Sequence, residues 1–203
     1  MSSPVRFGVI GLNHNHIYAQ TALLLRAGAE LVSFFAEESP LAKEYGSRYP
    51  QARRARSRQE LLEDATIQLV VSAAIPSQRG PLGVEAMHHG KDYMSDKPAF
   101  TTLAQLTEAR QVQAKTRRIF SVCFSERFEN AATVRAGELV KAGAIGKVVQ
   151  TVGLGPHRID APNRPAWFFK RAQTGGILTD IASHQMDQFL FAIARHQQIR
   201  EHG

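Results

Sequence analysis

Short apolar runs alternate with helix-like segments through the first 124 residues, and this alternation restricts the fold more than any other feature. The run at 67–74 is fully apolar in its centre, as in a buried strand. Alternating strands and helices with short connections predict an α/β fold, a doubly wound parallel sheet with helices on both faces. Strands are expected at 5–10, 30–35, 67–74, 91–95 and 119–124, and helices at 17–28, 39–49, 59–64 and 103–116, with one more ending near residue 89.

The residues after 124 follow a different pattern. A helix is expected at 132–146, a strand at 147–155 and a second long helix at 175–194. An irregular stretch that contains three prolines separates the strand from the second helix. We therefore expect two units, 1–124 and 125–203, of which the second has α+β character.

Composition excludes several classes of protein. Hydrophobic residues make up 43% and charged residues 21% of the 203 residues, which is ordinary for a globular protein. The one cysteine, Cys123, excludes a disulfide framework, and its apolar neighbours predict a buried structural thiol. No apolar run reaches the roughly 18 residues of a membrane span, and the first residues lack the apolar core of a signal peptide. We expect a soluble, cytoplasmic protein without a membrane partner.

The formal net charge of +7 leaves a nucleic-acid partner open. The charge is scattered, however, and no zinc-finger, RNA-recognition or basic-zipper pattern accompanies it. The only dense run comprises Arg53, Arg54, Arg56 and Arg58. We expect no nucleic-acid partner, because a basic field that attracts a phosphate-bearing cofactor also explains the charge.

The first predicted strand leads into Gly-Leu-Asn-His-Asn-His at 11–16. A dinucleotide fingerprint reads G-x-G-x-x-G at this place, and only Gly11 matches it. Asn13 replaces the second glycine, and it tolerates unusual backbone angles, so the turn can persist with a modified phosphate contact. The position between a strand and a helix makes this loop a candidate cofactor site, with an ordinary turn as the alternative. The candidates are Gly11, Leu12, Asn13, His14 and Asn15.

A carboxylate after the second strand of such a sheet binds the ribose hydroxyls of NAD. Glu37 and Glu38 both follow the strand at 30–35, and Glu37 is our candidate. No Arg or Lys lies at this turn to bind a 2′-phosphate, which favours NAD over NADP. Two solvated glutamates near a helix N-terminus are the alternative.

Two later motifs carry candidate catalytic groups. Lys97 lies in Asp-Lys-Pro directly after a short strand, where the proline can hold it rigidly toward a cleft, although most lysines are surface residues. Asp180 and His184 lie one helical turn apart, so a carboxylate can orient an imidazole and stabilise its protonated form. A solvated Asp–His pair is the alternative.

The histidines do not predict a metal site. Asp180 and His184 form at most a half-site, and no H-x-x-x-H or cysteine pair completes it. The doublets His14/His16 and His88/His89 give no complete ligand set either. We therefore expect no metal.

Together these features resemble the Gfo/Idh/MocA oxidoreductases. The resemblance rests on a Rossmann-type start, on Asp-Lys-Pro at 96–98, and on G-G-x-L-x-D-x-x-x-H-x-x-D at 175–187, and it runs from about Val5 to Ala194. It implies an NAD(P)-dependent dehydrogenase that acts on a sugar, polyol or related hydroxy compound. It also implies that full-length relatives are homo-oligomers.

The resemblance further implies roles for single residues. His184 would take the proton of the substrate hydroxyl, Asp180 would orient and charge-balance His184, and Lys97 would hydrogen-bond the reacting oxygen. Ala74 would lie beside the nicotinamide ribose, with Lys97 also near the cofactor. Substrate contacts are expected from the irregular segment before the Asp/His helix, at His157, Arg158 and Trp167, although Trp167 can also pack under a loop.

The chain also departs from the family pattern. Members are typically much longer, with a second domain built on a broad sheet, whereas this chain has one predicted strand after residue 124. We therefore expect a C-terminal truncation, an incomplete second unit, and a final segment 195–203 that lacks the family pattern. A non-catalytic nucleotide-binding remnant or regulatory module of the same family is the alternative to an active dehydrogenase.

Overall fold

The computed structural model describes residues 3–155 and 157–198. Six parallel strands form one sheet in the order β3-β2-β1-β4-β5-β6. The order reverses direction at β1, which lies between β2 and β4, so a crevice is expected at the carboxyl ends of β1 and β4. The strands are β1 (Arg6–Ile10), β2 (Glu30–Phe35), β3 (Arg53–Arg54), β4 (Leu69–Ser72), β5 (Asp92–Asp96) and β6 (Phe120–Cys123).

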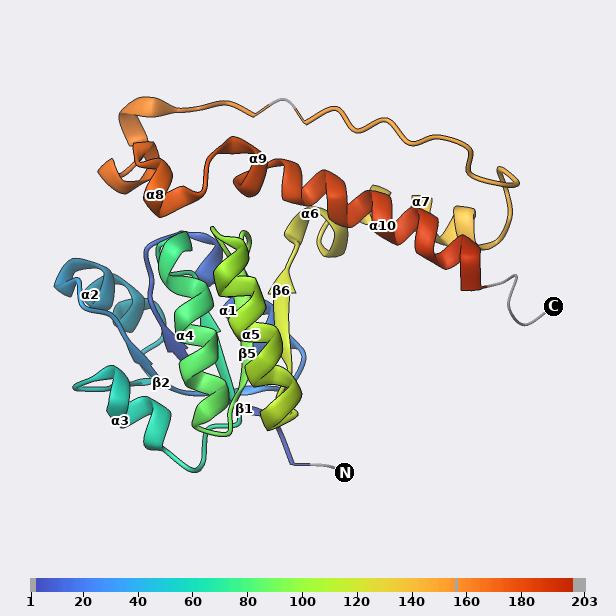
Figure 1. Ribbon diagram of the computed structural model, residues 1–203. Coiled ribbons are helices and arrows are strands. Elements are labelled where there is room, and N and C mark those ends of the chain that lie inside the picture. The colour runs from blue at the N-terminus through green and yellow to red at the C-terminus, as the bar shows by residue number, and fades with distance from the viewer. Residues whose placement is uncertain (1–2, 156, 199–203) are drawn as a thin grey trace.

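Helices cover both faces of the sheet, as the doubly wound arrangement predicts (Figure 1). Successive strand residues alternate between the faces, and neighbouring residues of β4 show this alternation. Val71 packs in the cluster that contains Tyr45, whereas Val70 packs in the cluster that contains Leu61. The helices of this part are α1 (His16–Arg26), α2 (Ser39–Arg48), α3 (Arg58–Glu63), α4 (Pro76–His88) and α5 (Leu103–Thr116).

The predicted Rossmann-type sheet is confirmed, and one strand was missed. The missed strand, β3, pairs with Ser33 and Phe34 of β2 at the sheet edge. It is two exposed arginines long, so it has no apolar period that a sequence pattern could reveal. The dense arginine run therefore begins in an edge strand.

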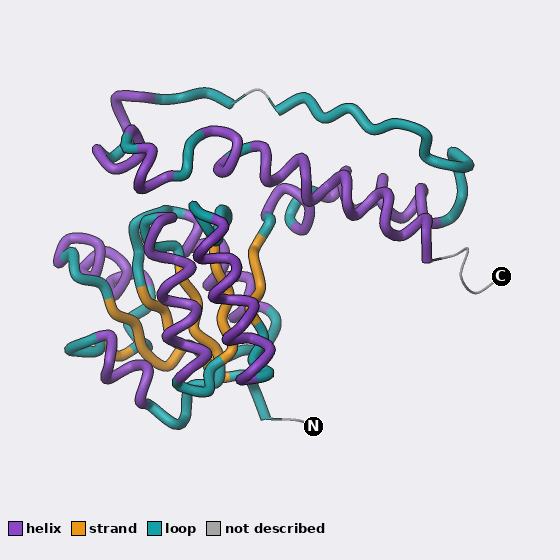
Figure 2. The backbone as a smooth tube through the Cα atoms, in the orientation of Figure 1, coloured by secondary structure: helices purple, strands orange, loops and turns teal. Residues whose placement is uncertain are grey.

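The C-terminal part is helical. It contains α6 (Ser125–Phe128), α7 (Ala131–Lys141), α8 (Arg171–Thr174), α9 (Ile177–Asp180) and α10 (Ala182–Gln198), with short 3₁₀ turns at Ala161–Asn163 and Ala166–Phe169. Helix α10 packs against α6 and α7, and a long loop runs back alongside it toward α8 (Figure 2). The predicted helix at 175–194 is two helices, because the backbone breaks at Ile181.

The predicted strand at 147–155 is wrong. This segment lies in the long loop and pairs with no strand among the described residues. Its apolar side chains face solvent, with exposed fractions of 91% for Val149 and 88% for Leu154. A β pattern forms a strand only where a neighbouring edge accepts its hydrogen bonds, and the described chain offers this segment none. The last residues of the chain, 199–203, lie outside the described residues.

Among the described residues, none of the helices has both the length and the apolar character needed to cross a lipid bilayer.

Candidate functional site

The loop after β1 is held against the end of β4. The backbone N–H of Gly11 donates to Phe35 O at 3.0 Å, and the N–H of His14 donates to Ala73 O at 2.9 Å. Gly11 has φ +82°, and a Cβ built on it would lie 2.5 Å from the Cβ of Ala74. The loop therefore requires glycine at this position, both for the left-handed backbone and for the close approach to Ala74.

A cavity of about 310 Å³ opens beside this loop, at the carboxyl ends of β1, β2 and β4. It is lined by Gly11, Asn13, Ala74 and both Glu37 and Glu38. This is where an α/β sheet with this strand order binds a dinucleotide. The glycine cradle, the carboxylates and the position all fit NAD, so these residues would hold its adenosine and phosphate part.

Three details modify the predicted cofactor residues. Asn13 Nδ2 donates to Glu38 Oε1 at 2.6 Å, which leaves Glu37 as the glutamate without a bond to the loop. The side chain of Leu12 is 4% exposed and packs in the core, and Leu12 is not among the residues that line this cavity. Arg58 also lines the cavity and pairs with Glu85 at 3.3 Å. Arg58 was named from the sequence within the dense arginine run but was not placed at this cleft, because it begins α3 and does not belong to the turn that carries Glu37.

A buried ion pair, Arg79–Asp96, lies next to the turn that carries Lys97. Arg79 and Asp96 are each 1% exposed, with 3.2 Å between Arg79 Nη2 and Asp96 Oδ2. Arg79 also donates to three backbone carbonyls, those of Ala74 at 2.6 Å, Lys97 at 2.6 Å and Pro98 at 3.2 Å. One guanidinium therefore joins the turn after β4 to the turn that carries Lys97. The sequence patterns did not reveal Arg79, since one arginine inside a helix carries no motif.

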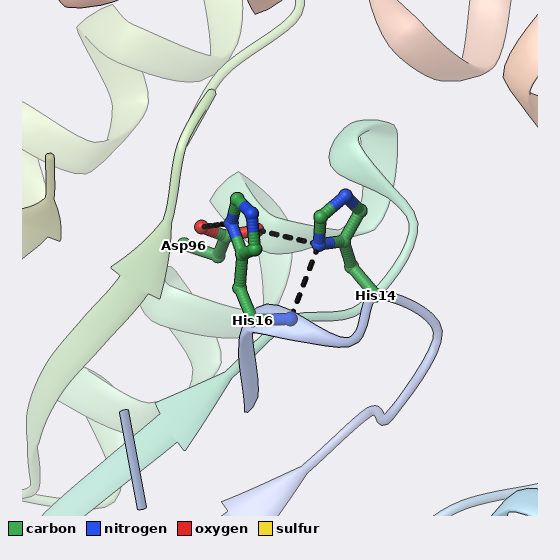
Figure 3. A group of neighbouring side chains, drawn as sticks. All are labelled: His14, His16 and Asp96. Atoms are coloured by element: carbon green, nitrogen blue, oxygen red, sulfur yellow. Dashed lines mark hydrogen bonds and ion pairs between the residues drawn. The ribbon is translucent and has the colours of Figure 1, made fainter. Parts of the chain in front are cut away.

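Two histidines flank Asp96 on its other side (Figure 3). His16 Nδ1 lies 3.0 Å from Asp96 Oδ1, and His14 Nδ1 lies 3.6 Å from Asp96 Oδ2. Burial, together with the charge of His16, lowers the pKa of His14 to about 3, so its ring is neutral at physiological pH. Burial opposes the ionisation of Asp96, but the hydrogen bond with His16 and the charge of Arg79 hold its pKa at about 2.

Lys97 pairs with Asp180. Its ammonium lies 3.0 Å from Asp180 Oδ1, and the two side chains are 5% and 16% exposed. Asp180 has no contact of this kind with His184 in the described chain, although the two lie four residues apart. A turn at Ile181 lies between the two residues, because α9 ends at Asp180 and α10 begins at Ala182. The resemblance implied that Asp180 orients His184, but in the structure the Asp180 carboxylate forms its ion pair with Lys97.

His184 is 2% exposed and lies at the start of α10. Its Nε2 is 3.8 Å from Glu126 Oε1, and its ring meets Phe124 edge-on. Within residues 3–155 and 157–198, its Nδ1 has no hydrogen-bond partner. Burial, with the nearby charge of Lys97, lowers the pKa of His184. The imidazole is therefore neutral near pH 7 and can accept a proton. Glu126 was missed, because it lies in a short helix without a recognisable motif.

The motifs that carry Lys97, Asp180 and His184 meet in one cavity of about 340 Å³. Residues from the first unit and from the C-terminal helices share its walls, namely His14, Asn15, His16, Lys97, Ser125, Glu126, His157, Arg164, Phe168, Asp180, Ile181 and His184. Segments that are 83 positions apart in the sequence, at Lys97 and Asp180, are thus brought within bonding distance.

A further cavity, of about 420 Å³, adjoins the 340 Å³ cavity and shares part of its lining. His157 lines both the 340 Å³ and the 420 Å³ cavity, and Arg158 lines the 420 Å³ cavity; that these two residues contact substrate stays a prediction. Trp167 lines neither of them and packs edge-on against Phe168. Phe168 and Arg164, which form a cation–π pair at 4.4 Å, line both cavities instead.

Cys123 lies at the end of β6 and is half-buried. Burial and the charge of Asp96 raise the pKa of the thiol to about 12. It stays protonated, as a structural thiol does.

Comparison with known proteins adds independent evidence. The family model described as "Oxidoreductase family, NAD-binding Rossmann fold" matches residues 5–124, and the GFO/IDH/MocA C-terminal domain model matches residues 133–200. The NAD(+)-dependent scyllo-inositol 2-dehydrogenase of Bacillus subtilis (strain 168) is 28% identical over 188 residues, which is 92% of this chain and 53% of that protein.

Solved structures show the same fold. A crystal structure from Erwinia carotovora atroseptica SCRI1043, described provisionally as an oxidoreductase, is 43% identical with a TM-score of 0.91, covering 94% of this chain and 57% of that one. A levoglucosan dehydrogenase in complex with NADH and levoglucosan is 23% identical with a TM-score of 0.79, covering 94% of this chain and 54% of that one, and it supports the fold alone.

The chain spans about half the length of these relatives. The family model nevertheless matches more than half of this chain. The Erwinia structure has the same fold as the chain over 94% of its residues. The chain belongs to the GFO/IDH/MocA family of oxidoreductases, whose N-terminal domain is an NAD-binding Rossmann fold.

Proposed function

We propose that this protein is a dehydrogenase that uses NAD to oxidise a hydroxyl group of a sugar, a cyclic polyol or a related compound. The observation that supports this most strongly is the convergence of Lys97, Asp180 and His184 on one cavity of about 340 Å³ beside the dinucleotide cleft. The scyllo-inositol dehydrogenase to which the chain is similar acts on a cyclic polyol.

NAD, when bound, supplies the acceptor for the hydride that leaves the substrate carbon. The chain's own residues accept the proton that the substrate hydroxyl loses. His184 is neutral because burial and Lys97 lower its pKa, so it can take the proton from the substrate hydroxyl. The Lys97 ammonium hydrogen-bonds the same oxygen and stabilises the negative charge that develops there.

Asp180 acts as the partner of Lys97 in this proposal. The 3.0 Å ion pair fixes the ammonium, which has almost no contact with solvent. Arg79 holds the same turn from behind through the backbone carbonyl of Lys97. Two buried groups thus restrict the position of the lysine before substrate binds, which is the alignment that catalysis requires.

We propose His157 and Arg158 as substrate contacts, since both line cavities next to Asp180. For the cofactor, we propose Glu37 as the carboxylate that binds the ribose hydroxyls. The same carboxylate would repel a 2′-phosphate, so NAD is preferred over NADP. Arg58 lies in the same cleft but is already paired with Glu85.

A dehydrogenase assay tests this function. The purified chain is titrated with NADH by fluorescence and then assayed with NAD and a panel that includes scyllo-inositol, levoglucosan and common sugars. His184→Asn and Lys97→Met are each expected to lower kcat by about 100-fold or more, and His184→Asn is expected to leave NADH binding intact. His88→Asn changes an exposed histidine and serves as the matched control. Unchanged turnover in both active-site variants would contradict the assigned roles.

A second candidate is a nucleotide-binding module without turnover. The apolar side chains that favour it lie along the long loop, where Val149, Val152 and Leu154 are 91%, 75% and 88% exposed. Apolar surface of this extent is normally covered by another protein surface. NADH binding by the wild-type chain, with no turnover across the whole panel, would favour this second candidate.

A further inference from the structure

The turn after β1 and the end of β5 together form a cluster of three groups that can bind a metal. His14 and His16 come from the turn and from the first residue of α1, and Asp96 is the last residue of β5 (Figure 3). One ligand atom from each residue lies within 4.8 Å of the others, and the two imidazole centroids are 4.0 Å apart. Asp96 lies 80 positions after His16, so no local sequence motif contains all three.

The buried carboxylate of Asp96 is incompletely satisfied. The residue is 1% exposed, and Oδ2 makes no hydrogen bond among the described residues. Two nitrogens lie near this oxygen, Arg79 Nη2 at 3.2 Å and His14 Nδ1 at 3.6 Å. The ion pair with Arg79 offsets the charge, but its geometry leaves Oδ2 without a directed donor.

The nitrogen of His14 that faces Oδ2 carries a lone pair. The backbone N–H of His16 donates to His14 Nδ1 at 3.3 Å, which places the ring proton on Nε2. Two electron-pair donors, Nδ1 and Oδ2, therefore face each other across 3.6 Å in a buried site. Such a pair is unfavourable by itself and favourable when a cation lies between the two atoms.

We propose that His14, His16 and Asp96 form a binding site for one divalent transition-metal ion of the zinc class. The ligands are Nδ1 of each imidazole and one or both carboxylate oxygens. Bond lengths near 2.0–2.2 Å in a tetrahedral site place ligand atoms roughly 3.4 Å apart. The two separations in the structure, 3.0 Å and 3.6 Å, are close to that value.

The donor set selects the kind of ion. Two imidazoles and one carboxylate suit zinc, cobalt or iron, whereas calcium and magnesium prefer oxygen ligands throughout. Binding requires the proton of His16 Nδ1, which now serves the bond to Asp96, to move to Nε2 of the same ring. Both histidines line the cavity of about 340 Å³ that they share with Lys97 and His184.

The neighbouring cations do not prevent binding. Arg79 donates to the backbone carbonyls of Ala74, Lys97 and Pro98, so it keeps these partners when Oδ2 turns to a metal. The Lys97 ammonium is paired with Asp180. Lys97 therefore has a countercharge of its own, whereas Arg79 would share the Asp96 carboxylate with the metal while keeping its three carbonyl partners.

The test measures metal binding by the full chain without a purification tag and without cofactor, so it does not depend on the proposed dehydrogenase function. Zinc chloride is titrated calorimetrically, and cobalt chloride is titrated with detection of its visible absorption bands. One ion per chain is expected, with an intense four-coordinate cobalt spectrum. His14→Ala and His16→Ala are each expected to weaken zinc binding by at least tenfold.

His88→Ala is the matched control, since it removes an exposed histidine at the end of α4 and is expected to leave binding unchanged. Asp96→Asn disturbs the buried pair with Arg79, so the histidine variants, checked for folding by circular dichroism, decide the outcome. The proposal is overturned if the wild-type chain at about 50 μM takes up no stoichiometric zinc. It is equally overturned if both histidine variants bind as the wild type does.

Discussion

The ammonium of Lys97 lies 3.0 Å from Oδ1 of Asp180, and this contact joins the parallel sheet to the C-terminal helices. Lys97 follows β5 directly, and Asp180 is the last residue of α9. Both side chains are largely removed from water. The pair therefore connects the turn that carries Lys97 with the C-terminal helices that line the same cavity.

Removing the charge of Asp180 is expected to destabilise the protein more than removing the charge of Lys97. Asp180→Asn leaves an ammonium that is 5% exposed without its countercharge, whereas Lys97→Met leaves a carboxylate that keeps some access to water. Asp180→Asn should lower the free energy of unfolding by about 3 kcal/mol, and Lys97→Met by less. Urea denaturation of both variants measures the difference, and the reverse order would contradict it.

Activity and stability should share a dependence on pH through His184. Burial and Lys97 lower its pKa, so below the unfolded value of about 6.5 the unfolded chain binds a proton that the folded chain does not. The unfolding free energy therefore falls as the pH drops below about 6.5, and the acid limb of kcat/KM lies below that pH too. Unfolding of wild type and His184→Gln between pH 5 and 8 should show a shallower slope for the variant. His88→Gln, an exposed control, should keep the wild-type slope.

Alanine substitutions at two glycines with left-handed backbone should separate two costs in stability, that of backbone strain and that of a steric clash of the added Cβ. Gly11 and Gly28 have φ of +82° and +86°, but only at Gly11 does an added Cβ meet other atoms, at 2.5 Å from Ala74 Cβ. Gly28→Ala should cost about 1 kcal/mol of stability, and Gly11→Ala about 2 kcal/mol or more, with weaker NADH binding. Thermal unfolding and a fluorescence titration measure both quantities. Equal effects in the two variants would mean that the loop moves away from Ala74 without cost.

Removing the buried guanidinium of Arg79 should destabilise the protein far more than removing an exposed one. Arg79→Met leaves the Asp96 carboxylate, 1% exposed, without its ion pair, and it releases three backbone carbonyls. A loss of about 3–5 kcal/mol is expected. Arg56→Met removes a guanidinium that is 92% exposed and should change stability by less than about 0.5 kcal/mol. Similar urea midpoints for the two variants would contradict this prediction.

The sequence predicted most of the sheet because its strands carry their own pattern. The centre of the strand at 67–74 is apolar throughout, since β4 is covered on both faces, and this is visible without a structure. Edge strand β3 carries no such pattern, because it is short and exposed. The segment at 147–155 has a strand pattern without a partner strand, and pairing is a property of the neighbours rather than of the segment.

The sequence by itself determined the alternation of the first unit, the glycine turn at Gly11 and the motifs that carry Lys97, Asp180 and His184. Only the tertiary structure decided how these groups combine. In the fold, Asp180 forms an ion pair with Lys97 rather than with His184. The fold also places Arg79, His14 and His16 around Asp96. Local spacing records which residues share a strand or a helix. The contacts of a buried charge depend on which segments the folded sheet places beside it, and those lie many tens of residues away in the chain.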